Sequence, residues 1–140
     1  MKYHGCILSF TEERNNELMK AFRQAIHDSQ YIDITRISQM VVNTPCSRFW
    51  VSEERALVVI VALLKGIPVL NTMRPTKREM FREIFSRVIT LRQQQPSMPL
   101  AELISIVVNS PAPQFYMTPR SAMETIYKIK KQRHSTHSPL

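Results

Sequence analysis

Apolar residues recur at helical spacing along most of the chain. Leu18, Phe22 and Ile26, for example, stand four residues apart in a stretch that predicts a helix over about residues 12–28. Stripes of the same kind predict five more helices, at 34–42, from 53, from 76, at 100–108 and from 119. Only two glycines are present, which disfavours the many tight hairpins of a β fold. The sequence therefore predicts an all-α protein.

Polar residues mark the ends of these helices. Ser52 and Thr118 are favoured N-caps, because their oxygens accept bonds from free backbone N–H groups. Thr76 and Glu79 form a capping-box pattern for the helix that follows. Two asparagines end the second and fifth helices, where we expect a left-handed backbone: Asn43 and Asn109.

An internal repeat organises the chain. Residues 41–52, VVNTPCSRFWVS, align with residues 107–118, VVNSPAPQFYMT, at an offset of 66 residues. The alignment needs no gap from residues 11–66 to residues 77–132. We interpret it as a duplication that gives two tandem three-helix units packed into one compact helical domain. The predicted parts are an N-terminal segment (1–10), the first unit (11–66), a linker (67–75), the second unit (76–132) and a flexible basic tail (133–140).

The third helix differs between the two predicted units. Residues 56–64 are apolar on nearly every face, which is typical of a helix in the middle of a fold. In the second unit, Ala122, Met123 and Ile126 form one narrow stripe. We therefore expect the first of these helices to be central and the second to lie on the surface.

Each repeat carries a proline-containing loop that ends in two aromatic residues. Phe49 and Phe115 are expected to fill the core, because a duplicated unit most easily preserves packing. For Trp50 and Tyr116 two interpretations stay open, namely packing in the fold or stacking on bases or a peptide.

The run of residues 45–56, PCSRFWVSEERA, resembles a motif of small uncharacterised bacterial proteins carried on phages or mobile elements. The second repeat departs from it at Gln114 and at residues 119–121. The resemblance implies no activity.

Positive charge is concentrated in the second half of the chain. Of the net charge of +8, residues 1–70 supply +1 and residues 71–140 supply +7. Such an asymmetry indicates a polyanionic partner, although a solvated basic face is the alternative. The residues predicted to contact nucleic acid are Arg74, Lys77, Arg78, Arg82, Arg120, Lys128, Lys130, Lys131 and Arg133.

Catalytic and metal-binding signatures are absent from the sequence. Cys6 and Cys46 form no CxxC pair, and the spacing of His134 and His137 falls in the expected tail. The chain shows no phosphate-binding glycine loop, and we expect no cofactor, no metal and no enzymatic activity. No apolar run approaches the roughly 20 residues that span a bilayer, so we expect a cytoplasmic protein without a membrane partner.

Two functional hypotheses follow. The first is a non-enzymatic accessory or regulatory protein that binds nucleic acid through its basic second half. The alternative is a protein–protein interaction module, or a helical homo-oligomer, with no nucleic-acid role. A helix-turn-helix is disfavoured, because residues 43–51 are longer than its 3–4-residue turn.

Overall fold

Six α-helices and one short 3₁₀ helix make up the computed structural model, which describes the backbone of residues 2–136 and the side chains of residues 10–133. They are α1 (Lys2–Asp28), α2 (Ile34–Val42), α3 (Glu53–Leu64), η1 (Val69–Thr72), α4 (Pro75–Gln94), α5 (Leu100–Val108) and α6 (Pro119–Thr136). The residues described contain no strand, only an isolated bridge between Cys46 and Ala112. The all-α prediction is confirmed.

Local signals set most of the helix boundaries. α2 and α5 span the ranges predicted from their apolar stripes. The Asp33 carboxylate caps α2 by accepting bonds from the N–H groups of Thr35 and Arg36, at 3.1 and 3.4 Å. α1 begins at Lys2, so it includes most of the predicted N-terminal segment 1–10. α6 continues to Thr136, into the predicted tail 133–140, of which residues 137–140 lie outside the part described.

Two local predictions are wrong. α4 begins at Pro75 with Arg74 in the cap position, so Thr76 lies inside the first turn. The fixed φ of proline suits this first helical position. Asn43 and Asn109 both have φ −91°, outside the left-handed region, because each keeps its N–H bonded to the preceding turn as the chain leaves the helix. The left-handed residue of this region is Tyr116, with φ 57°.

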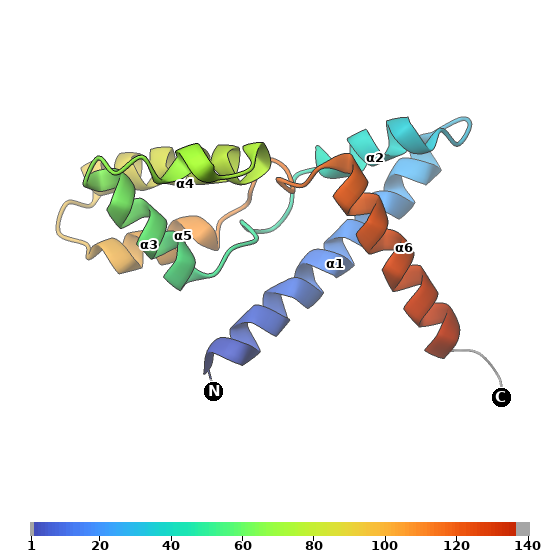
Figure 1. Ribbon diagram of the computed structural model, residues 1–140, viewed down its shortest axis with the longest axis horizontal. Helices are drawn as coiled ribbons and strands as arrows, with labels where there is room; N and C mark the ends of the chain where they lie inside the picture. Colours follow the sequence, from blue (N-terminus) through green and yellow to red (C-terminus); the bar gives the residue numbers. More distant parts are fainter. Residues whose placement is uncertain (1, 137–140) are drawn as a thin grey trace. The chain divides into compact units, whose positions relative to one another are not determined.

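The helices group into two compact units that do not follow the order of the chain. Unit 1 comprises residues 1–44 and 113–140 and joins α6 to α1 and α2. Unit 2 comprises residues 45–112 and joins α3 to α4 and α5, with η1 on α3 and α4 (Figure 1). The structure thus divides the chain differently from the predicted ranges 11–66 and 76–132. Each third helix packs with the helix pair of the other sequence repeat.

A backbone hydrogen bond fixes the entry to the third helix in each unit. In unit 1 the N–H of Phe115 donates to the carbonyl of Val42, at 3.0 Å. In unit 2 the N–H of Phe49 donates to the carbonyl of Val108, also at 3.0 Å. These carbonyls belong to the last turn of α2 and of α5, where no partner exists within the helix. Both phenylalanine side chains are buried, which confirms their predicted place in the core.

Further bonds close unit 2 at the two points where the chain enters and leaves it. Cys46 and Ala112 exchange two backbone hydrogen bonds, each of 3.0 Å. Arg87 on α4 donates to the Glu83 carboxylate at 2.8 Å and to the carbonyl of Pro111 at 2.7 Å. Its guanidinium also lies 5.0 Å from the centre of the Phe49 ring. One side chain therefore holds both loops of this unit against α4.

The third helices are more alike in burial than their sequences indicate. α3 buries Ala56, Val59 and Ile60, but Val58 is 60% exposed. The expectation that α3 is enclosed on all faces is therefore wrong, since it packs only on α4, α5 and η1. α6 buries the expected narrow stripe of Ala122, Met123 and Ile126.

Methyl NOEs test the grouping of the helices. We expect the buried Ile126 of α6 to show NOEs to methyl groups of α2, and Ile60 of α3 to methyl groups of α5, because these helices pack together. NOEs from Ile126 to α5 and from Ile60 to α2 would instead support grouping in chain order.

The substitution Arg87→Ala tests the contact that holds the loops of unit 2. It removes a charge-assisted bond to a carbonyl, an ion pair and a cation–π contact, so we expect unfolding free energy to fall by about 2 kcal/mol. Urea unfolding measures the change. Arg120→Ala is the matched control, because the Arg120–Glu124 pair is largely exposed and its loss should cost less than about 0.5 kcal/mol. Equal losses in the two variants would argue against a special role for Arg87.

Candidate functional site

Helix α6 supports the candidate site. The Thr118 hydroxyl accepts a bond from the N–H of Ser121 at 3.1 Å, and Pro119 occupies the first helical position. The Arg120 Nε donates to Glu124 at 3.2 Å, a one-turn pair on the surface of the helix. These local contacts, together with the buried stripe, hold the helix to α1 and α2.

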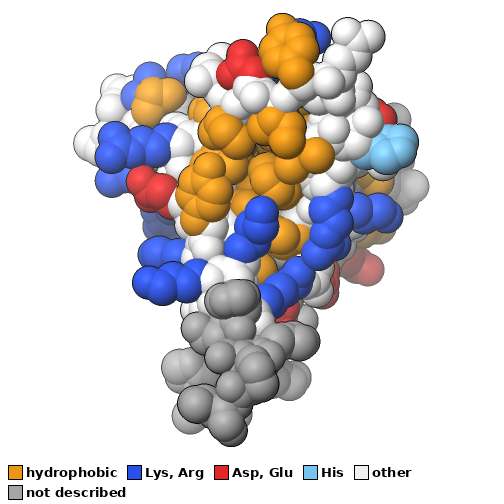
Figure 2. All heavy atoms as spheres, turned by 90° about the vertical axis from the view of Figure 1, so that its right-hand side faces the viewer, with side chains coloured by type: hydrophobic (Ala, Val, Ile, Leu, Met, Phe, Trp, Pro, Cys, Tyr) orange, Lys and Arg blue, Asp and Glu red, His pale blue; other side chains and the backbone are white. Residues whose placement is uncertain are grey.

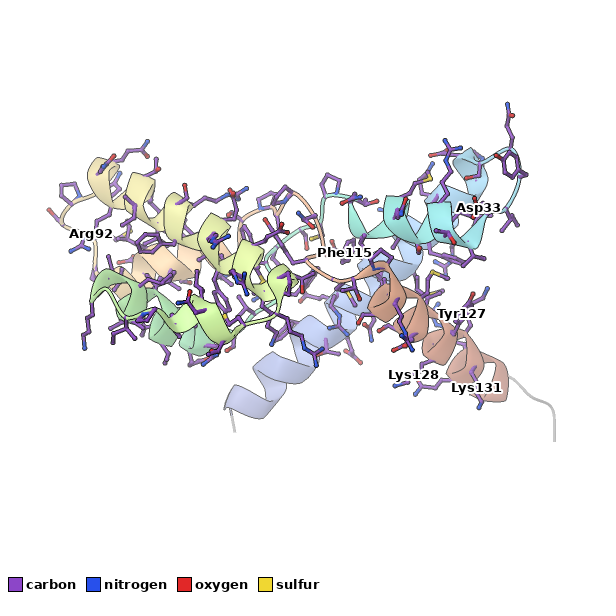
Figure 3. All side chains as sticks on the ribbon, turned by 45° about the horizontal axis from the view of Figure 1, so that its top comes forward. Asp33, Arg92, Phe115, Tyr127, Lys128 and Lys131 are labelled. Atoms are coloured by element: carbon purple, nitrogen blue, oxygen red, sulfur yellow. The ribbon has the colours of Figure 1, made fainter. Side chains whose placement is uncertain are left out.

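The final turns of α6 carry closely spaced positive charge. Lys128, Lys130, Lys131 and Arg133 are all exposed, and the sequence has no acidic residue after Glu124. Figure 3 shows Lys128 and Lys131 on α6 beside Tyr127, which is 51% exposed. We call Tyr127, Lys128 and Lys131 the α6 strip. Their spacing of one, three and four residues places them on adjoining parts of the solvent-facing surface.

Lys130 and Arg133 lie on another side of the same helix. Both line an open groove between α6 and α1. The Lys130 ammonium stands 5.1 Å from the centre of the Phe22 ring, a cation–π distance. The five predicted contact residues of α6 therefore divide between the outer surface and this groove.

The other four predicted contact residues lie at the start of α4, in unit 2. Arg74, Lys77 and Arg82 are exposed. Arg78 is half-buried, and its Nη2 donates to the carbonyl of Met73 at 3.0 Å. Because the nine residues fall in two units, the structure does not gather them into one site.

Charge is distributed evenly between the two units. Unit 1 contains ten Lys and Arg against six Asp and Glu, and unit 2 contains nine against five. Each unit therefore has a net charge of +4, although the two halves of the sequence carry +1 and +7. The cause is the exchange of third helices, which moves the basic α6 to the first helix pair. The basic second half is thus a property of the sequence and not of either unit.

The aromatic residues singled out from the sequence are less accessible than Tyr127. Trp50 and Tyr116 are both half-buried, and the indole Nε1 of Trp50 is fully covered. Sequence reasoning missed Tyr127 as a stacking candidate. The signal was the position of an aromatic residue directly before Lys128 and one turn before Lys131.

Ionisable groups elsewhere form no evident catalytic arrangement among the residues described. No three His, Cys, Asp or Glu side chains of this part of the chain are placed to hold a metal ion. Gln24 donates to both oxygens of Asp28 and, together with His27, holds the pKa of that exposed carboxyl below its usual value. Cys46 is buried, with its Sγ 3.4 Å from the carbonyl of Arg48. The side chains of His134 and His137 lie outside the described residues.

Neither a family model, a curated protein nor a solved structure matches this chain. The resemblance of residues 45–56 to a motif of small bacterial proteins therefore stays a prediction. Within the part of the chain that the structure describes, no helix is long and apolar enough to cross a membrane.

Proposed function

We propose that the protein is a non-enzymatic accessory or regulatory protein that binds nucleic acid, and that the α6 strip makes the principal contacts. The observation that carries this proposal is the run of four exposed cations from Lys128 to Arg133, which follows the last acidic residue of the helix. A rigid helix that presents several cations over two turns suits a polyphosphate backbone.

The chemistry of the strip favours binding with little sequence selectivity. The ammonium groups of Lys128 and Lys131 attract phosphates as point charges and read no base. The exposed ring of Tyr127 can stack on an unpaired base, a contact that every base accepts. We therefore infer a preference for single strands over duplexes.

The second candidate function is a protein-interaction module. It is supported by apolar side chains that stand open to solvent, among them Val58 on α3 and Ile106 on α5. The groove between α1 and α6 gives a more specific form of this candidate.

We also infer that the chain arose by internal duplication followed by exchange of the third helices. The support is the recurrence of the same contacts 66 residues apart. Phe49 and Phe115 bond equivalent carbonyls, and the hydroxyls of Ser52 and Thr118 cap equivalent helices at 3.1 Å.

Fluorescence anisotropy with a labelled single strand of about 16 nucleotides, measured across a salt series, tests the nucleic-acid proposal. We expect log K to fall linearly with log salt, by roughly 0.7 for each phosphate contacted. The double variant Lys128→Glu/Lys131→Glu should weaken binding at least about tenfold and reduce the slope by about 1.4, because two contacts are lost.

The matched control is Lys65→Glu/Arg92→Glu, which changes the net charge equally at two exposed positions of unit 2. It should retain most of the affinity. Equal losses in both double variants would reduce the effect to overall charge, and no binding by the native protein at low salt would refute the proposal. Tyr127→Ala should weaken single-strand binding and leave duplex binding nearly unchanged.

A further inference from the structure

An open groove of about 880 Å³ lies between α1 and α6 of unit 1. Its floor consists of Met19, Phe22 and Ile26, which are spaced three and four residues apart and therefore share one face of α1. Two of these side chains, Met19 and Phe22, also reach into the core and are nearly fully covered. The floor is thus apolar and firmly anchored.

Cationic and imidazole groups form the walls of this groove. Arg23 and His27 extend from α1, and Lys130 and Arg133 extend from α6. None of the described residues that line it is acidic. Figure 2 shows this side of unit 1, where hydrophobic side chains gather between Lys and Arg side chains. An apolar floor between positive walls is complementary to an apolar ligand with negative flanks.

The chain offers an internal comparison for these wall residues. At the positions 66 residues away, Arg23 corresponds to Ile89, Lys130 to Leu64 and Arg133 to Ile67. The same helix pairing in unit 2 is therefore built with aliphatic residues at all three places. Packing of the third helix on its neighbour does not require the cations, so their presence in unit 1 needs another reason.

We propose that the groove binds an acidic amphipathic helix of a partner protein. The floor extends over seven residues of α1, or about 10 Å, which equals two helical turns and matches apolar anchors at i, i+3 or i+4 and i+7. Cations on both walls then face carboxylates that flank the apolar stripe of the partner. A second copy of this chain is a poor occupant, because each unit carries a net charge of +4. Nucleic acid has no apolar surface of this shape to cover the floor.

The test uses a defined probe, a labelled synthetic helix of about two heptads with leucines on one face and glutamates on both flanks. A companion probe keeps the leucines and replaces every glutamate with lysine. By anisotropy, we expect the native protein to bind the acidic probe at least about tenfold more tightly than the basic probe at low salt, since only the former complements the walls.

Wall and floor variants locate the binding. The triple variant Arg23→Ile/Lys130→Leu/Arg133→Ile installs the residues that unit 2 carries, and it should abolish the preference for the acidic probe while helicity is retained. Ile26→Gln makes the half-buried part of the floor polar and should weaken the acidic probe several-fold. Lys128→Glu/Lys131→Glu, on the outer surface of α6, should leave the probe bound within about twofold.

This inference can fail independently of the nucleic-acid proposal, because the latter depends on the α6 strip. Equal binding of the two probes, or an unchanged preference in the triple variant, would overturn it. So would concentration-dependent self-association that the triple variant removes, which would assign the groove to a second copy. Binding of the native protein to vesicles of anionic lipid but to neither probe would assign it to a lipid surface.

Discussion

The structure depends on one pair of backbone hydrogen bonds, in which a loop N–H satisfies the last-turn carbonyl of a neighbouring helix. Phe115 makes this bond to Val42 and Phe49 makes it to Val108. A helix end leaves such carbonyls without a partner, and leaving them buried and unbonded is costly. The phenylalanine that donates the bond also buries its ring, so the satisfied carbonyl and the filled core come from the same residue. Together these contacts determine which helix pair receives each third helix.

The exchange of third helices changes what the charge pattern means. Read along the sequence, the chain has a nearly neutral half and a strongly basic half. Because α6 packs with α1 and α2, the most basic helix lies beside the helices that contain the most acidic part of the sequence, and the two units become equal in net charge. A partner that recognises this protein by electrostatics must therefore do so through the local arrangement on one helix, since neither unit offers a uniformly positive surface.

The sequence predicted what local interactions control. The bounds of α2 and α5, the capping residues Ser52 and Thr118 and the burial of both phenylalanines follow from spacing and from hydrogen bonding within a few residues. The partners of the third helices did not follow, because the loops before them are long enough to reach either helix pair. The contacts of Arg87 were missed for the same reason, since its carbonyl partner is 24 residues away. Tyr127 and the groove became evident only when the neighbours of α6 were known.

The candidate sites exist because α6 is longer than its counterpart. α3 ends at Leu64, where Gly66 adopts φ 77° and Pro68 follows, a combination that stops a helix. The position equivalent to Gly66 in α6 is Gln132, which has no such effect, and the helix continues to Thr136. The added turns extend past the buried stripe, so the residues there answer to solvent and ligands rather than to the core. Lys131 on the outer surface and Arg133 in the groove both belong to this extension. A single change of helix-stop residue between the two repeats therefore accounts for much of the surface on which both binding proposals stand.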